Sequence, residues 1–377
     1  MFRLPNRSDN GLKISVPAMF VIGRAVTGIG IGADLAIVST YISEVAPRNT
    51  RARYMSIIFA ISGIGTVLGT WLGLLLTTPA GHWPLGLPFA LGKSLSDGWR
   101  WMYYIGALLA LVALLMRVQL PESPLWLISK NRLAEAEITI KKMESRAERK
   151  GTLPAPELIA APTLAPAIGV QRTHNGPIGQ ILMNPMYRSR AALLLAVWFF
   201  AYITVYAFAA GFTSVLNGIG YIQSEAGLVV SIGVFGRLIA GLLSAKYSEL
   251  LERKLWLVIS AIITLAGALI VSIAHNNIYA SGVGAMVIFI GFNLWVPMAY
   301  AWSAENFPTQ ARSTGFALVD GIGHVGGGIG LLVVAPLILG MNPIAALLML
   351  VGFLVVAAVI AQFGVNTRGR SLGEVSP

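Results

Sequence analysis

The chain has 377 residues, of which 56% are hydrophobic and 11% are charged, and its mean hydropathy is +0.73. Soluble globular domains carry about 25% charged residues and cannot bury this much apolar surface, so a soluble enzyme and a disordered chain are both excluded. The sequence contains no cysteine, which excludes disulfides and thiolate chemistry. The formal net charge of +11 is typical of a membrane protein with basic loops on one side, rather than of a nucleic-acid-binding surface.

Nine apolar runs follow one another along the chain, and each reaches the roughly 20 residues that a helix needs to cross a bilayer. They are rich in Leu, Ile, Val, Ala and Gly and lack the alternation of a membrane β-barrel. We therefore predict an all-α, multi-pass protein of the cell membrane, with helices over 16–44, 54–76, 99–119, 191–214, 226–245, 255–274, 281–303, 314–335 and 343–363.

Basic residues are concentrated on one side of these runs. Of the 27 Lys and Arg residues, 20 lie in the connections 46–53, 117–190, 245–254, 305–313 and 364–377. The connections on the opposite side contain only Lys93. Because cytoplasmic loops are enriched in Lys and Arg, we predict that the first set faces the cytoplasm together with the C-terminus.

An internal repeat links the first predicted helix with the seventh. The segments YISEVAPRNTR at 41–51 and WSAENFPTQAR at 302–312 share Glu, Pro and Arg at an offset of 261 residues (305 − 44). Parallel repeats of six helices are typical of one large class of membrane transporters. Three predicted helices precede the seventh within its half, but none precedes the first, so we expect three helices of the complete architecture, about 90 residues, to lie before this sequence.

Four segments resemble the major facilitator superfamily, and within it the sugar porter and metabolite:proton symporter branches. They are GRAVTGIGIG with YISEVAP at 23–47, PESPLWL at 121–127, ENFPTQAR at 305–312 and TRGRSL at 367–372. The resemblance implies a major facilitator fold in which the nine predicted helices are helices 4–12 of twelve. The helix that corresponds to the seventh lacks the Gln and Asn side chains with which sugar porters bind hexose.

The resemblance also implies a division of the chain into four parts. Residues 1–120 would form an incomplete N-terminal half with three membrane helices. Residues 121–190 would form a cytoplasmic loop with short helices and a linker, and residues 191–363 a six-helix C-terminal half. Residues 364–377 would form a cytoplasmic tail.

Ionisable residues inside the predicted helices are candidates for proton coupling, because a charge at the bilayer centre costs about 2.5–3.5 kcal/mol. Asp34 would carry a proton, bind a solute or pair with a basic group that packs against it. Asp320 and His324 are four residues apart on one helix face, which suits a proton relay or a neutralised structural pair. The resemblance implies that Arg24 pairs with a proton-carrying carboxylate of helix 1, and the alternative is an arginine that reaches the membrane surface.

Two groups of mainly aromatic residues are candidates for contact with a solute, because rings with polar edges suit a sugar or an organic anion. Simple packing is the alternative for side chains at helical spacing. The candidates are Trp198, Tyr202 and Tyr206 on the fourth predicted helix, and Asn293, Trp295 and Tyr300 on the seventh. Charged residues are also expected to form a network between helices that biases the inward- or outward-facing state, and these are Glu44, Arg51, Arg237, Glu305 and Arg312.

These features favour a secondary active transporter of a small polar solute, a sugar or organic acid, that is driven by protons and works by alternating access. The alternative is a transport-inactive remnant or a membrane sensor with the same scaffold. An enzyme is disfavoured, since the sequence offers no metal cluster, nucleophile–base pair or nucleotide-binding loop. We expect a monomer whose partners are the solute, protons and the bilayer, with no cofactor, metal or nucleic acid.

Overall fold

The computed structural model describes residues 16–47, 49–77, 98–117, 121–149, 176–274, 277–338 and 340–376. The regular elements within these ranges are helices. They are α1 (Val16–Val45), α2 (Arg51–Thr77), α3 (Gly98–Arg117), α4 (Pro124–Ser129), α5 (Leu133–Glu148), α6 (Pro177–Met183), α7 (Pro185–Ala209), α8 (Phe212–Gly218), α9 (Gln223–Gly233), α10 (Phe235–Tyr247), α11 (Arg253–Ile273), α12 (Ile278–Leu294), α13 (Val296–Glu305), α14 (Arg312–Ile329), α15 (Ala335–Leu337), α16 (Pro343–Ala361) and α17 (Leu372–Val375).

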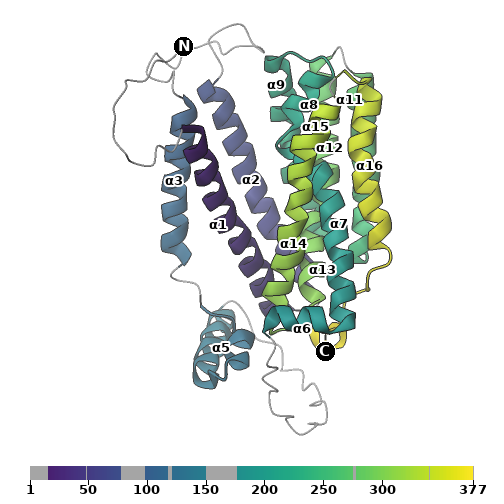
Figure 1. Cartoon of the computed structure of the whole chain (residues 1–377). Coiled ribbons are helices and arrows are strands. Elements are labelled where there is room, and N and C mark those ends of the chain that lie inside the picture. Colours follow the sequence, from purple (N-terminus) through teal and green to yellow (C-terminus); the bar gives the residue numbers. More distant parts are fainter. Residues whose placement is uncertain are drawn as a thin grey trace, which may run out of the picture.

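Nine helical segments of the described residues are long and apolar enough to cross a membrane, which confirms the predicted all-α class and the nine spans. Three of the segments consist of two helical elements each, namely α9 with α10, α12 with α13, and α14 with the π-helical turn Gly330–Val334. The short helices α4 and α5 follow α3, in the stretch where the sequence predicts short helices of a cytoplasmic loop. Figure 1 shows α5 and α6 beyond the ends of the long helices.

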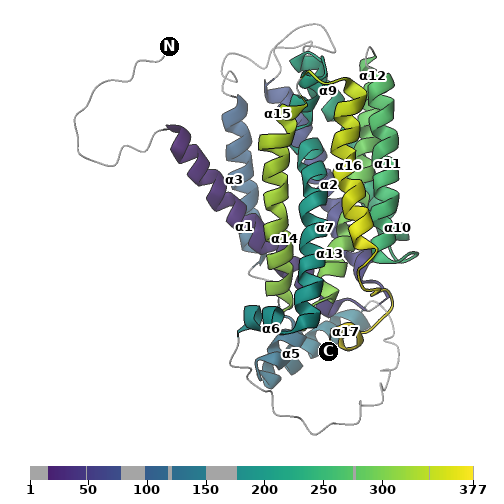
Figure 2. The ribbon, with the colours of Figure 1, turned by 45° about the vertical axis from the view of Figure 1, so that its right-hand side comes forward.

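The long helices form two groups that meet at one end. Helices α1, α2 and α3 stand on one side, and α7, α9–α14 and α16 on the other (Figures 1 and 2). Helix α2 packs against α10, while α1 packs against α13 and α14. We call the lower end in Figure 1, where α1 ends and α2, α7, α11 and α14 begin, the basic end. It is the side that the distribution of Lys and Arg predicts to be cytoplasmic. Towards the opposite end α1 diverges from α14.

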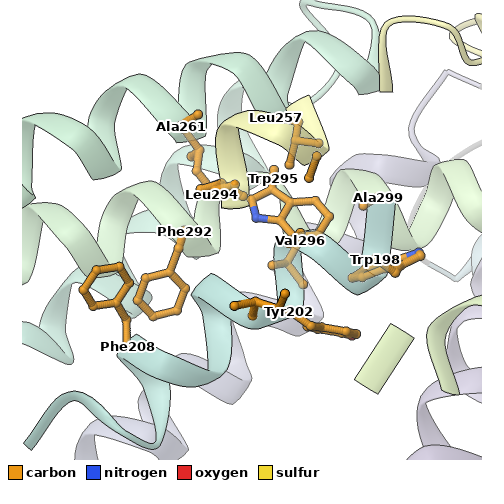
Figure 3. Packing of buried hydrophobic residues seen from close by; sticks show 14 of the residues in the cluster. Trp198, Tyr202, Phe208, Leu257, Ala261, Phe292, Leu294, Trp295, Val296 and Ala299 are labelled. Carbon is orange, nitrogen blue, oxygen red and sulfur yellow. The ribbon is translucent and has the colours of Figure 1, made fainter. Parts of the chain in front are cut away.

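The core lies in the second group of helices. All ten residues of α13 are buried, and α7 and α12 bury much of their length, whereas α3 exposes its apolar side chains throughout its span. Figure 3 shows how rings from α7 and from the junction of α12 and α13 interlock, among them Trp198, Tyr202, Phe208, Phe292 and Trp295.

Two breaks in long helices place polar groups at mid-membrane depth. Helix α12 ends at Leu294 and α13 begins at Val296, because Pro297 lacks the N–H that a continuous helix would need. The second break, at Val234, separates α9 from α10. Asn293 lies in the last turn of α12 and Arg237 in the first turn of α10, and the two side chains meet.

Helix α14 approaches α7 closely through a row of glycines. A Cβ atom at Gly323, Gly326, Gly327 or Gly330 would collide with the backbone or side chains of α7. Small residues at such positions let membrane helices approach each other. At Gly28 and Gly32 of α1, by contrast, no described residue lies within 4 Å of a Cβ. The α7–α14 contact therefore carries the close packing.

We expect Gly326→Ala to destabilise the protein by about 1–3 kcal/mol, since the new methyl group would overlap the carbonyl oxygen of Phe199. Gly328→Ala is the matched control on the same helix, because no described residue lies within 4 Å of its Cβ. Thermal unfolding of the purified protein in detergent would be compared for the two variants. A lower midpoint for Gly326→Ala alone is expected, and equal midpoints would contradict the close contact.

Candidate transport site and charge network

A buried carboxylate, a phenol and an imidazole lie together where α7 meets α14. The Tyr202 hydroxyl donates a hydrogen bond to Asp320 Oδ1 at 2.5 Å, and His324 Nδ1 lies 3.7 Å from Asp320 Oδ2. The same imidazole nitrogen lies 2.7 Å from the backbone oxygen of Asp320, one helical turn earlier. The side chain of Asp320 is 3% exposed, whereas that of His324 is 33% exposed. The imidazole thus links a buried acid to an accessible position.

An aromatic cluster adjoins this acid. Trp198 contacts Tyr202, Trp295 and Tyr300 at ring-centroid distances of 4.9, 4.9 and 5.3 Å. Its indole N–H donates to Ser303 Oγ at 2.9 Å, so the side chain is both fully enclosed and satisfied. The cluster brings together predicted residues from two helices that are about a hundred positions apart in the sequence.

Burial separates these aromatic residues into two kinds. Trp198 and Trp295 are fully buried among other rings, which agrees with the packing alternative (Figure 3). Tyr206 is half-buried and contacts the ring of His324 at 5.7 Å, on the accessible side of the acid. Tyr206 and His324 are therefore the more exposed members of this group.

A second polar group lies between the two sets of helices, where α2 meets α10. Arg237 Nη1 donates to Asn293 Oδ1 at 3.4 Å, and its Nη2 donates to Ser62 Oγ at 3.2 Å. The guanidinium also lies over the ring of Phe59, 4.5 Å from its centroid. Asn293 donates from its own amide to the Phe289 carbonyl, so both ends of this side chain are held.

At the basic end, the glutamate of each sequence repeat lies beside the arginine of the other repeat. Arg312 of the second repeat pairs with Glu44 of the first at 3.1 Å, and Arg51 of the first lies 3.9 Å from Glu305 of the second. None of the four side chains is more than 9% exposed. We call these four residues the crossed pairs. Four of the five residues that the sequence predicts for a charge network lie in them.

Arg237 is the fifth predicted member, and the structure places it elsewhere. Among the described residues its contacts are neutral and come from α2 and α12 at mid-membrane depth. It is separated along α10 from the basic end, where the crossed pairs lie. The expectation that Arg237 joins the charge network is therefore wrong, because Arg237 lies away from the crossed pairs.

Other members of the network escape prediction from the sequence. Arg253 is fully buried and lies 3.6 Å from Glu305, which also accepts a hydrogen bond from Thr367. Ser123, the N-cap of α4, donates to Glu44 at 2.6 Å. Thr367 and Ser123 lie in two of the four segments that carry the family resemblance, and that position was the available signal.

Asp34 and Arg24 are the two residues of α1 that the sequence suggests for proton coupling. Asp34 forms an ion pair with Arg117 of α3 at 2.6 Å, with both side chains about half exposed. This pair is the alternative in which Asp34 serves as a packing partner for a basic group, and Asp34 is not part of the group around Asp320. The side chain of Arg24 lies outside the described residues.

The fold and the sequence together define the class of the protein. The profile of the family described as "Sugar (and other) transporter" matches residues 11–377, and the chain belongs to this family of the major facilitator superfamily. It is therefore a multi-pass membrane protein of a transporter family, and not an enzyme. Its arrangement is similar to that of the proton:xylose symporter XylE, with TM-scores of 0.69 and 0.71 for two structures at 20% identity. Each match covers 96% of this chain and 74% of the other.

Two relatives extend the comparison to metabolites. The chain is 25% identical over 371 residues to the putative metabolite transport protein YyaJ of Bacillus subtilis, covering 96% of this chain and 75% of YyaJ. It is 23% identical over 360 residues to the niacin transporter NiaP of Acinetobacter baylyi, covering 93% of this chain and 74% of NiaP. The protein is thus a sugar or metabolite transporter of the superfamily.

The crossed pairs predict how the basic end opens. Ser56 on α2 is fully buried against Met298 of α13, and the chain has no native cysteine, so Ser56→Cys provides a single label. Because removal of one partner leaves a buried charge unpaired, at a cost of about 3–5 kcal/mol, Glu44→Gln should favour separation of the helices. We expect maleimide labelling of the introduced thiol to accelerate at least about tenfold in this background.

Glu135→Gln is the control for that labelling experiment, because Glu135 forms an exposed ion pair with Arg132 on α5. It removes a carboxylate that is not one of the crossed pairs, and the labelling rate should stay at the level of the parent Ser56→Cys protein. Equal labelling rates with and without Glu44→Gln, in protein that elutes as a single species, would contradict a closing role for the crossed pairs.

Proposed function

We propose that the protein is a proton-coupled secondary transporter of a small polar metabolite, working by alternating access. The observation that carries this proposal is the buried carboxylate of Asp320 on α14, held by Tyr202 and adjoining His324. A carboxylate inside a membrane helix is costly, and such residues characteristically belong to solute or proton pathways.

Asp320 has the environment of a reversible proton carrier. Its partners among the described residues are a phenol and an imidazole rather than an arginine, so no permanent positive charge holds it in the ionised form. Tyr202 can donate to the ionised carboxylate and remain in contact with the protonated form. The His324 ring nitrogens can accept and donate a proton, and its side chain is one-third exposed, which suits transfer of a proton between solution and Asp320.

Alternating access requires two arrangements of the helices, and the crossed pairs supply one of them. They close the basic end, while α1 and α14 diverge towards the opposite end (Figure 1). The pairs join helices of different groups, so their rupture would let the groups rock apart at the basic end. The proton carrier lies along α14 between the two ends, where either arrangement can expose it.

Proton coupling is tested by uptake into proteoliposomes. Labelled xylose and nicotinate serve as probes, following the names of relatives. An inward proton gradient should stimulate uptake of a transported probe, and Asp320→Asn should abolish this stimulation while exchange across the membrane without a gradient continues. The asparagine keeps the shape of the side chain but cannot carry the proton.

The control for this uptake experiment is Glu137→Gln, which removes an exposed carboxylate of α5 that pairs with Lys141. Its uptake should respond to the gradient as the parent protein does. Uptake that ignores the gradient in the parent protein, or that keeps its full response in Asp320→Asn, would refute the proposed coupling through this carboxylate.

A further inference from the structure

Arg237 is an intramembrane charge that the proton pathway leaves unexplained. It lies in the span Gln223–Tyr247, ten residues from the basic end of α10, which is about 15 Å of helix. Its hydrogen-bond partners are Asn293 and Ser62, and its Nε–H is buried without a partner among the described residues. A buried donor of this kind needs an explanation, such as an ion or ligand that satisfies it.

The charge of this guanidinium is not neutralised within the described part of the chain. Arg312 and Arg253 each lie within 4 Å of a carboxylate, and Arg117 pairs with Asp34, whereas the groups around Arg237 are an amide, a hydroxyl and aromatic rings. Neutral hydrogen-bond partners compensate only part of the cost of taking a cation out of water. A bound anion would therefore neutralise the charge of Arg237 at this position.

The surroundings also limit the kind of anion. Phe59 covers one face of the guanidinium, and the phenol of Tyr300 lies within electrostatic range of it, so the site combines a fork of N–H donors with apolar ring surface. A guanidinium binds carboxylate through two parallel hydrogen bonds, and aromatic surface suits the body of a small organic molecule. The site lies between α2 of one helix group and α10 and α12 of the other, where binding can be sensed by both.

We propose that Arg237 is the anion-binding residue of the transport site and that the solute is a small organic carboxylate. The solute's carboxylate pairs with the guanidinium. This assignment rests on the proposed transport function and narrows its substrate class from a sugar or organic acid to the acid.

The assignment is tested by equilibrium binding to the purified protein in detergent, which requires neither transport nor a proton gradient. The probes are nicotinate and benzoate, their uncharged amides nicotinamide and benzamide, and xylose. Each amide keeps the ring of its acid and removes the charge. We expect at least one of the acids to bind and its amide to bind about tenfold to a hundredfold more weakly.

Variants at position 237 identify the residue responsible. Arg237→Gln should lose the preference for the acid over its amide, and Arg237→Lys should keep part of it, because it retains the charge without the planar fork. Arg188→Gln is the control, since Arg188 is an exposed arginine of α7 outside this site. It should bind as the parent protein does.

The outcomes separate this proposal from the transport proposal. Folded protein that binds xylose or the amides as well as the acids, that binds neither acid, or that keeps its preference in Arg237→Gln overturns the anion assignment. Acid binding that depends on Arg237, combined with uptake that ignores a proton gradient, supports the anion assignment and refutes proton coupling instead.

Discussion

Two carboxylate–guanidinium pairs, each joining one repeat to the other, are the interaction on which this arrangement of helices depends. Glu44 with Arg312 and Arg51 with Glu305 are almost completely removed from solvent at the basic end. In such surroundings a charge without its partner is far more costly than a charge in water. The two helix groups cannot separate at this end unless a charged side chain becomes exposed or loses its partner. The pairs therefore determine where the groups meet.

Further along the helices from the crossed pairs, helix packing determines where Asp320 and Arg237 lie. The glycines of α14 let α7 lie close enough for Tyr202 to reach Asp320, which larger residues would prevent. The break at Pro297 turns the chain where Asn293 meets Arg237. The positions of Asp320 and Arg237 along their helices are therefore set by close backbone approach and by helix breaks.

The sequence predicts the helices and their order better than the contacts between side chains of different helices. Apolar length identifies the nine spans, and the offset between Glu44 and Glu305 identifies the repeat, because both are properties of a single helix or of the chain order. Spacing of four residues also places Asp320 beside His324 on one face. Contacts between helices depend on packing that spacing does not encode, so neither the exchange of charges between repeats nor the pairing of Asp34 with Arg117 could be read from it. For the same reason, the sequence wrongly assigns Arg237 to the charge network, because the residue type alone does not show which helices an arginine contacts.

Asp320 and Arg237 carry charges of opposite sign, and this explains how a proton and an anion would move together. Asp320 accepts a hydrogen bond from Tyr202, and the ring of Trp198 contacts the rings of both Tyr202 and Tyr300. A proton on Asp320 and a carboxylate on Arg237 neutralise one charge each, so full loading removes both charges from the interior. Loading with one partner alone removes one charge and leaves the other to be enclosed without its counterpart, at the cost that an isolated charge carries in the membrane. Closure around the site is therefore least costly when both sites are filled, which favours joint movement of the proton and the anion.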